Sequence, residues 1–251
     1  MRANPAVQGA VVTAHKLRLY RAAATDFTSL DVAAVLAEEV NAVATSTSAV
    51  EGYARDPLAL THVLTQVLPA EPYVVCLGAG GAGTALLLAL HQSQITGLTG
   101  VGNASGAAPS GVRAVFADTD PQALDAMRAV ADRAGIATGH LTFALVNHPA
   151  DCDKLIAAAP DSAVVINATG LGKDAAGSPV TDQVPFAKDM LAWDLNYRGD
   201  LRFLDQAKTC GIRTVDGWAY FIAGWTSALA AIAGIPLTRT LLDDFARVAQ
   251  R

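Results

Sequence analysis

The sequence contains few charged residues and few aromatic ones. Of its 251 residues, 16% are charged and 6% are aromatic, whereas 52% are hydrophobic. A chain this apolar can bury a sizeable core, which excludes the disordered class. Lys and Arg number 18 against 23 Asp and Glu, so the net charge is -5, and no basic tract stands out. We therefore expect no nucleic-acid partner.

Cysteine is also scarce. Cys76, Cys152 and Cys210 are odd in number and far apart. They form neither a disulfide framework nor a CxxC metal pair, so we expect a reducing, cytoplasmic location. Residues 1–8 lack the apolar core of a signal peptide. The uncharged stretch 217–238 is long enough to span a bilayer, but Gly, Pro, Ser and Thr interrupt it, so we expect a buried helix and no membrane partner.

Between residues 73 and 216, expected strands and helices alternate. This alternation indicates an α/β fold with a Rossmann doubly wound parallel sheet. The expected strands are 73–77, 112–116, 141–146, 163–167, 191–195 and 213–215, and the expected helices are 84–90, 121–134, 152–158 and 200–210.

The rest of the chain departs from this alternation. Residues 96–111 are rich in Gly, Ser and Ala and indicate a flexible insertion. Residues 1–70 contain one strand candidate, 10–13, and two helix candidates, 30–39 and 57–68. With so few strands, we do not expect them to form a complete domain. We divide the chain into a partial domain (1–70), a dinucleotide-binding domain (71–216) and C-terminal helices at the domain junction (217–251).

One glycine-rich segment has the pattern of a dinucleotide-binding loop. Gly78-x-Gly80-x-x-Gly83 directly follows the first expected strand of the sheet and opens a helix. The first glycine permits a tight turn, the second lets the backbone approach a pyrophosphate, and the third allows close helix–strand packing. The helix N-terminus supplies N–H donors, so Gly81 and Ala82 are also candidate cofactor-binding residues. The alternative is a glycine-rich turn that only connects two elements.

The type of cofactor is predicted from Asp118, an acidic residue at the end of the next strand. A carboxylate there accepts hydrogen bonds from the ribose 2′-OH and repels a 2′-phosphate. Thr119 and Asp120 follow, so no Arg stands beside it to hold such a phosphate. We therefore predict NAD over NADP, although the insertion makes the spacing from the loop to Asp118 longer than usual.

Six segments of the chain, in order, carry further patterns. They are Val12-Thr13-Ala14-His15-Lys16, Glu39-Val40-Asn41-Ala42, Gly52-Tyr53-Ala54-Arg55-Asp56-Pro57, Ile166-Asn167-Ala168-Thr169-Gly170-Leu171-Gly172, Asp194-Leu195-Asn196-Tyr197 and Val215-Asp216-Gly217. In turn, they resemble the VTxPxK, AVNT, GxNTDG, INATxxG, DxxY and DG motifs of the shikimate dehydrogenase family, which includes the quinate/shikimate dehydrogenases.

The resemblance implies an N-terminal α/β substrate domain, a C-terminal Rossmann domain and catalysis in the cleft between them. It also implies reversible oxidation of a ring secondary alcohol, with hydride passing to the nicotinamide. Lys16 and Asp56 are the implied acid/base pair, and partial burial would lower the pKa of Lys16 so that it can act as a base. The implied substrate contacts are Thr13, Asn41 and Tyr197, and the implied cofactor contacts are Asn167, Thr169, Gly170 and Gly217.

Each of these side chains also has a simpler interpretation. Taken alone, Lys16 would be a solvated surface lysine. Asp56 would cap the helix that follows it. Asn41 would end a helix in the left-handed conformation, and Tyr197 would only pack. The histidines show no ligand spacing, so we predict no metal site.

Four departures from the family pattern bear on function. The match begins in the middle of the substrate domain, so we expect roughly sixty residues of that domain to be absent. The segment ending at Lys16 is one residue short and lacks the Pro, and Ala-Arg-Asp-Pro replaces Asn-Thr-Asp-Gly around Asp56. Gly224 stands where the family has a Gln that contacts substrate. Because polar partners for a polyhydroxylated ring are lost, a substrate other than shikimate is an alternative.

The leading hypothesis is an NAD-dependent oxidoreductase that acts on shikimate, quinate or a related alicyclic hydroxy acid. A second hypothesis is a catalytically degenerate, NAD-binding relative with a sensing or partner-binding role. A third is a reductase for another carbonyl compound. The apolar helix expected around 218–235 could serve a homodimer as well as a core.

Overall fold

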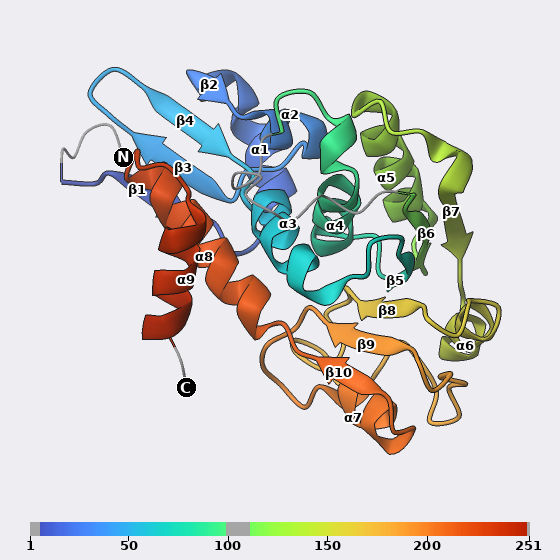
Figure 1. Cartoon of the computed structure of the whole chain (residues 1–251). Coiled ribbons are helices and arrows are strands. Elements are labelled where there is room, and N and C mark those ends of the chain that lie inside the picture. The colour runs from blue at the N-terminus through green and yellow to red at the C-terminus, as the bar shows by residue number, and fades with distance from the viewer. Residues whose placement is uncertain (1–5, 99–110, 250–251) are drawn as a thin grey trace.

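The computed structural model describes residues 6–98 and 111–249, which form two β-sheets joined by helices (Figure 1). The first sheet has the strand order β1-β3-β4-β2. Its β2–β4 pair is parallel, and the other two pairs are antiparallel. In chain order this part consists of β1 (Gly9–Val11), α1 (Lys16–Ala23), β2 (Ser29–Leu30), α2 (Val32–Ala37), β3 (Ala42–Thr45), β4 (Val50–Tyr53) and α3 (Asp56–Val67).

The second sheet has six strands in the order β10-β9-β8-β5-β6-β7 within the described part of the chain, and every neighbouring pair is parallel. This is the order of a doubly wound Rossmann sheet. The elements are β5 (Tyr73–Leu77), α4 (Gly81–Leu90), β6 (Arg113–Asp118), α5 (Pro121–Arg133), β7 (Leu141–Leu145), α6 (Pro149–Ala157), β8 (Val164–Asn167), β9 (Leu191–Asp194), α7 (Arg202–Thr209) and β10 (Arg213–Val215).

The predicted Rossmann part is confirmed, and its six strands lie within two residues of the expected bounds. These strands could be predicted because buried parallel strands, with helices on both faces of the sheet, are short apolar runs in the sequence. The predicted insertion 96–111 falls mostly on residues 99–110, outside the described residues. Helix 84–90 begins earlier, at Gly81. Helix 152–158 begins at Pro149, which suits the first turn of a helix.

The N-terminal part contains more structure than predicted. Strands β2, β3 and β4 and helix α1 were not expected from the sequence. β3 and β4 pair from Ala42↔Tyr53 to Thr45↔Val50, and strands this short depend on their neighbours in the sheet. The predicted helix 30–39 is shorter because Asp31 caps α2, its side chain accepting a hydrogen bond from Ala34 N at 2.7 Å.

One hydrophobic core runs through both parts of the molecule. Leu60 of α3, Leu86 of α4 and Val74 of β5 belong to the same buried cluster. Helix α3 packs on α4, and α2 packs on both α4 and α5. Arg133 Nη2 of α5 also donates a hydrogen bond to Leu36 O at 2.8 Å. Because the two parts share one packed interior, side chains on α1 and α3 hold a fixed position against the six-stranded sheet.

Helix α8 (Trp218–Ile232) returns from the end of the six-stranded sheet to the first sheet, as Figure 1 shows. It packs on α3, β1, β3 and α9 (Arg239–Val248). Ile222, Ala223 and Ala228 are buried, whereas Trp225 and Leu229 are exposed. Of the helices in the described ranges, none is long and apolar enough to cross a membrane.

Candidate active site

Lys16 and Asp56 meet where the two parts of the molecule join. Lys16 is the first residue of α1 and Asp56 the first of α3, and the lysine Nζ forms an ion pair with Oδ2 of Asp56. The two side chains are only 23% and 11% exposed, so the interpretation of Lys16 as a solvated surface lysine is wrong. Arg55 is the N-cap residue of α3, and no side chain caps it. The capping interpretation of Asp56 is therefore also wrong.

The backbone before each of these residues is held in place. His15 adopts a left-handed conformation, φ 58 and ψ 31, immediately before the lysine, which is uncommon for a non-glycine residue. Asn41 is buried, and its Oδ1 accepts a hydrogen bond from Arg55 N at 2.8 Å, one residue before Asp56. The left-handed residue after α2 is Glu38, with φ 53. The helix-end interpretation of Asn41 is therefore wrong.

The glycine-rich loop has the shape that a pyrophosphate requires. Gly78 has φ 114, and a Cβ there would lie 2.8 Å from the carbonyl carbon of Ala168. A Cβ on Gly83 would lie 2.2 Å from Gly78 O, so the start of α4 packs directly on the turn. At Gly80, by contrast, no heavy atom of the described residues beyond its own chain neighbours lies within 4 Å of the position that a Cβ would occupy. The loop therefore fits a dinucleotide, with open space at its second glycine and the α4 N-terminus beside it.

Asp118 is the last residue of β6 and hydrogen-bonds to the loop. Its Oδ2 accepts a hydrogen bond from Ala79 N at 2.6 Å, and its Oδ1 accepts one from Asp120 N at 2.9 Å. A carboxylate has further lone pairs and can also accept from a ribose hydroxyl. Asp118 therefore braces the loop in addition to any contact it makes with a cofactor.

A buried polar network links the ends of β8 and β9. Asn167 Oδ1 accepts hydrogen bonds from Thr169 N and Oγ1 at 3.0 and 2.6 Å, and Asn167 Nδ2 donates to Asp194 Oδ2 at 3.0 Å. Asn196 donates to the Thr169 carbonyl at 3.1 Å and, through its backbone N, to Asp194 Oδ1 at 2.8 Å. Burial raises the pKa of Asp194 to about 6, although the hydrogen bonds from Asn196 and Asn167 lower it. The network fixes the loop after β8.

Sequence reasoning did not identify Asp194 and Asn196 as members of this network. The available signal was their position at the carboxyl end of an expected buried strand, where unpaired polar groups are costly. Gly217, which follows β10, lies against the segment after β9. Its N donates to Asn196 O at 2.9 Å, and a Cβ would lie only 2.1 Å from Leu195 O. Gly217 therefore permits a close backbone approach at the start of α8.

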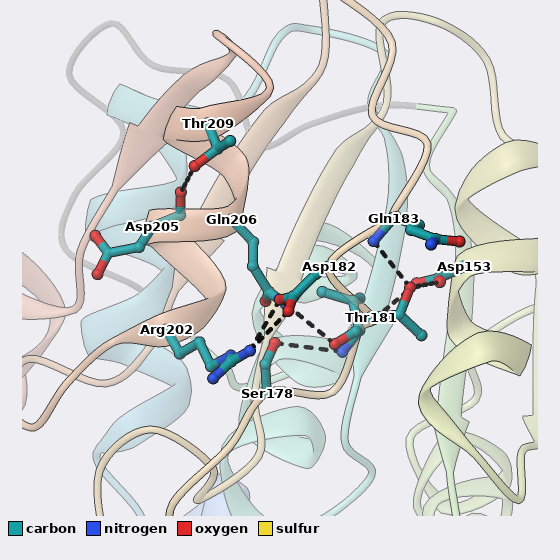
Figure 2. A network of polar contacts seen from close by, with 10 residues as sticks. Asp153, Ser178, Thr181, Asp182, Gln183, Arg202, Asp205, Gln206 and Thr209 are labelled. Atoms are coloured by element: carbon teal, nitrogen blue, oxygen red, sulfur yellow. Dashed lines mark hydrogen bonds and ion pairs between the residues drawn. The ribbon is translucent and has the colours of Figure 1, made fainter.

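A second network anchors the far end of the β8–β9 connection (Figure 2). Arg202 Nη2 binds both carboxylate oxygens of Asp182 at 3.0 and 2.9 Å, and Gln206 Nε2 donates to Asp182 Oδ1 at 2.8 Å. Thr181 Oγ1 donates to Asp153 Oδ2 at 2.5 Å. These contacts hold the β8–β9 connection between α6 and α7. They therefore also stabilise the loop directly after β8, which belongs to the same connection.

Aromatic side chains form the outer wall of the site. The ring of Tyr197 stacks on Phe221 of α8, with centroids 3.9 Å apart, and Phe221 contacts Trp225 edge-on at 6.2 Å. Tyr197 therefore does pack, and it also lines the cavity described below. Gly224 lies on the same helix, where a Cβ would be 3.8 Å from Asp56 Oδ1. This wall is apolar at the position where the family's motif carries a Gln.

These elements enclose a cavity of about 510 Å³. The structure places most predicted catalytic, substrate-binding and nicotinamide-side residues on its walls: Thr13, Lys16, Asn41, Asp56, Ala82, Thr169, Gly170 and Tyr197. The remaining predicted cofactor residues are not on its walls: Gly78, Gly80, Gly81, Gly83, Asp118, Asn167 and Gly217.

The charges around Lys16 act against the pKa shift that we expected. Burial lowers the pKa of Lys16. The carboxylates of Asp56 and Glu39 and the hydrogen bond to Asp56 together raise it by more than burial lowers it, so the pKa is above its ordinary value. The predicted lowering is therefore wrong, and Lys16 is protonated at neutral pH. Among residues 6–98 and 111–249, no group of three or more His, Cys, Asp or Glu side chains could hold a metal ion.

The fold and the loop together define a two-domain protein with a dinucleotide-type loop near the cavity that Lys16 and Asp56 line. No family model matches the chain. A shikimate dehydrogenase (NADP(+)) of Streptococcus gordonii is 28% identical over 195 residues, which covers 75% of this chain and 60% of that protein. The chain thus spans less than two thirds of this curated relative's length.

Two solved structures share the whole fold. The shikimate 5-dehydrogenase of Thermus thermophilus, in complex with NADP(H) and shikimate, has a TM-score of 0.66 at 23% identity and matches 98% of this chain and 80% of its own. The shikimate 5-dehydrogenase of Listeria monocytogenes, in complex with shikimate and NAD, has a TM-score of 0.68 at 16% identity and matches 99% and 79%. The resemblance to the shikimate dehydrogenases is therefore confirmed, and the chain has their two-domain fold.

Proposed function

We propose that the protein is a nicotinamide-dependent oxidoreductase that interconverts a ring secondary alcohol and its ketone, with Lys16 and Asp56 as the acid/base pair. The observation that carries the proposal is their partly buried ion pair on the wall of a cavity that the loop after β8 also lines. A bound nicotinamide would supply or accept the hydride. The same cavity is large enough for a carboxylate-bearing ring such as that of shikimate or quinate.

The residues of the chain handle the proton. A ketone oxygen that receives a hydride at its carbon also needs a proton, and Lys16 Nζ is protonated and held in the cavity by Asp56. Donation from this ammonium completes the alcohol, and the reverse transfer removes the hydroxyl proton during oxidation. Asn41 maintains the position of Asp56 through the backbone of Arg55. The raised pKa of Lys16 favours the direction of ketone reduction.

The relatives and the side chains of this chain favour different cofactors. The curated relative is named for NADP(+), and the Thermus thermophilus structure holds NADP(H), which favours NADP over the NAD preference expected from the sequence. The side chains of this chain favour NAD, because Asp118 would face a 2′-phosphate with like charge and Thr119 and Asp120 add no positive one. We propose NAD on the basis of this local chemistry alone.

Exchanging the charge at the end of β6 is expected to reverse this preference. In Asp118→Ser/Thr119→Arg, the repulsion disappears and a guanidinium becomes available to a 2′-phosphate. We expect the ratio of NADP affinity to NAD affinity to rise by more than about tenfold, or about 1.4 kcal/mol. Fluorescence titration with NADH and NADPH measures it. A wild-type protein that binds NADPH more tightly would show that the NAD proposal is wrong.

The substrate class follows from the wall formed by α8. Gly224 offers no hydrogen bond beside Asp56, and Phe221 and Trp225 flank it with apolar surface. A site built without polar partners loses little when its ligand lacks hydroxyls. We therefore propose that the substrate is an alicyclic hydroxy acid with fewer hydroxyl groups than shikimate, or with an apolar substituent that faces α8.

Restoring an amide at this position is expected to shift the specificity. Gly224→Gln should raise kcat/KM for shikimate by about two- to tenfold, the value of one net hydrogen bond, relative to a ring with fewer hydroxyls. Gly224→Leu is the matched control, since it fills similar space without an amide, and it should lower turnover of both. An equal effect of Gln and Leu on the two substrates would contradict this assignment.

The second hypothesis, a catalytically degenerate dinucleotide-binding relative, makes a different prediction. Such a protein would bind NADH or NADPH but would transfer no hydride to any ring ketone. Gly224, in place of the family's Gln that contacts substrate, is the feature that favours it. Hydride-transfer assays with folded protein distinguish it from the proposed oxidoreductase.

A further inference from the structure

Glu39 is a buried carboxyl group that the proposed acid/base chemistry does not use. It lies between α2 and β3, is 1% exposed, and its Oε1 has no hydrogen-bond partner among the described residues. Its Oε2 lies 3.2 Å from the position of a Cβ on Gly81, the first residue of α4. The carboxyl group is therefore next to the end of the helix where the dinucleotide's phosphates are expected. It stands where the AVNT motif has Ala.

The groups around Glu39 connect this position to the acid/base pair. Lys16 from α1 and Asp56 from α3 both interact with it electrostatically. Tyr220 from α8 interacts with the same group of charges. The pKa of its phenol is raised, mostly by burial and also by the charges of Asp56 and Glu39. On the remaining side lies the α4 N-terminus, the positive end of the helix dipole. Glu39 thus lies between two sites that the proposed reaction must coordinate.

A buried carboxylate with an oxygen that accepts no hydrogen bond is costly, and protonation reduces that cost. The pKa of Glu39 is raised to about 7, chiefly by burial. The charge of Lys16 lowers this pKa, and the charge of Asp56 raises it. Near neutral pH, the side chain therefore exchanges between a neutral and a charged form. The two forms differ in their effect on a neighbouring anion, because a carboxylate repels a phosphate whereas a protonated carboxyl can donate a hydrogen bond to it.

We propose that Glu39 is a positioning residue that takes up a proton when the dinucleotide binds, and thereby couples cofactor binding to the charge of the Lys16–Asp56 pair. This inference rests on the proposed function. With Glu39 neutral, one carboxylate instead of two stabilises the ammonium of Lys16. The Lys16 proton is then released to a substrate oxygen more readily. Ketone reduction needs an acid only when the dinucleotide is bound. The coupling therefore makes Lys16 a stronger acid in that bound form.

Binding titrations test this coupling without requiring turnover. The affinity for NADH and for NADPH is measured by fluorescence from pH 6 to 9 in wild type, in Glu39→Gln and in Glu38→Gln. If one proton is taken up, wild-type affinity falls by up to about tenfold per pH unit above the pKa of the free protein. Glu39→Gln removes the titrating group, so its affinity should stay nearly constant and should exceed that of wild type at high pH. Glu38→Gln, an exposed neighbour, should follow wild type.

Calorimetry of the wild-type protein gives a second, independent readout. Binding heats at pH 7.5 in buffers of different ionisation enthalpy report the protons taken up, so the result does not depend on whether Glu39→Gln folds. Proton uptake by the wild-type protein supports the proposal, and folded Glu39→Gln should take up no proton. Tight binding with no uptake, or a wild-type pH slope that persists in Glu39→Gln, overturns it. Failure to bind either dinucleotide overturns the proposed function itself, and this inference with it.

Discussion

Replacing Lys16 with Ala is expected to lower kcat by about 10²–10⁴-fold, the usual contribution of a general acid or base. The lysine is the proton-bearing group of the Lys16–Asp56 pair on the cavity wall, and an alanine cannot hold that proton. The variant should still bind the dinucleotide, because the glycine-rich loop between β5 and α4 is separate in sequence from α1, which carries Lys16. Steady-state kinetics combined with NADH or NADPH titration separates the two effects.

The matched control for this substitution is Lys208→Ala. Lys208 is exposed on α7 and pairs with a neighbour one helical turn away, Asp205, a pair that contributes little. Its loss should leave kcat unchanged. Asp56→Asn should also lower kcat and should make the pKa of Lys16 fall, since the amide no longer stabilises the ammonium. Normal turnover by Lys16→Ala would show that another group transfers the proton.

The second large effect is expected at Gly80. The space beside it is open, and its extended backbone, with φ −76, suits a serine at a helix N-cap. Gly80→Ser should therefore unfold at nearly the same temperature as wild type. Its side chain would occupy the space where the backbone should approach the pyrophosphate. We expect dinucleotide affinity to fall by about tenfold or more, which corresponds to about 1.4 kcal/mol.

Gly83→Ala should have the opposite profile. Its Cβ would lie 2.2 Å from the backbone oxygen of Gly78, so the helix must shift away from the turn. Overpacking of this kind costs about 1–3 kcal/mol of unfolding free energy, and thermal or denaturant unfolding measures it. If Gly80→Ser were destabilised and still bound the dinucleotide normally, the open space at Gly80 would not be the phosphate site.

Much of the Rossmann part could be predicted from the sequence because its signals are local. Each buried parallel strand is a short apolar run, and each glycine of the loop has one steric role. In the N-terminal sheet, the expected strand 10–13 corresponds to β1, but β2, β3 and β4 were missed because they depend on partners that are distant in the sequence. The hairpin of β3 and β4 is stabilised by partners such as β1 and α8, and Ala42–Thr45 alone does not encode a strand.

The chemistry of the candidate site was harder to predict than its fold. Lys16 and Asp56 are forty residues apart, so their meeting could only be inferred from the family resemblance. The direction of the pKa shift of Lys16 depends on which carboxylates surround it, and Glu39 became visible only through its burial. A pattern of residue types carries neither the desolvation nor the Coulomb energies that decide these shifts.

The most direct measurement is hydride transfer by the wild-type protein. Absorbance of the reduced nicotinamide is followed with NAD and with NADP against shikimate, quinate and ring acids with fewer hydroxyls, and again with Lys16→Ala. The proposed function predicts turnover of at least one ring alcohol, lost in Lys16→Ala. Folded protein that binds the dinucleotide but oxidises none of these alcohols, and reduces none of the corresponding ketones, would contradict the assignment of an oxidoreductase and favour the non-catalytic relative.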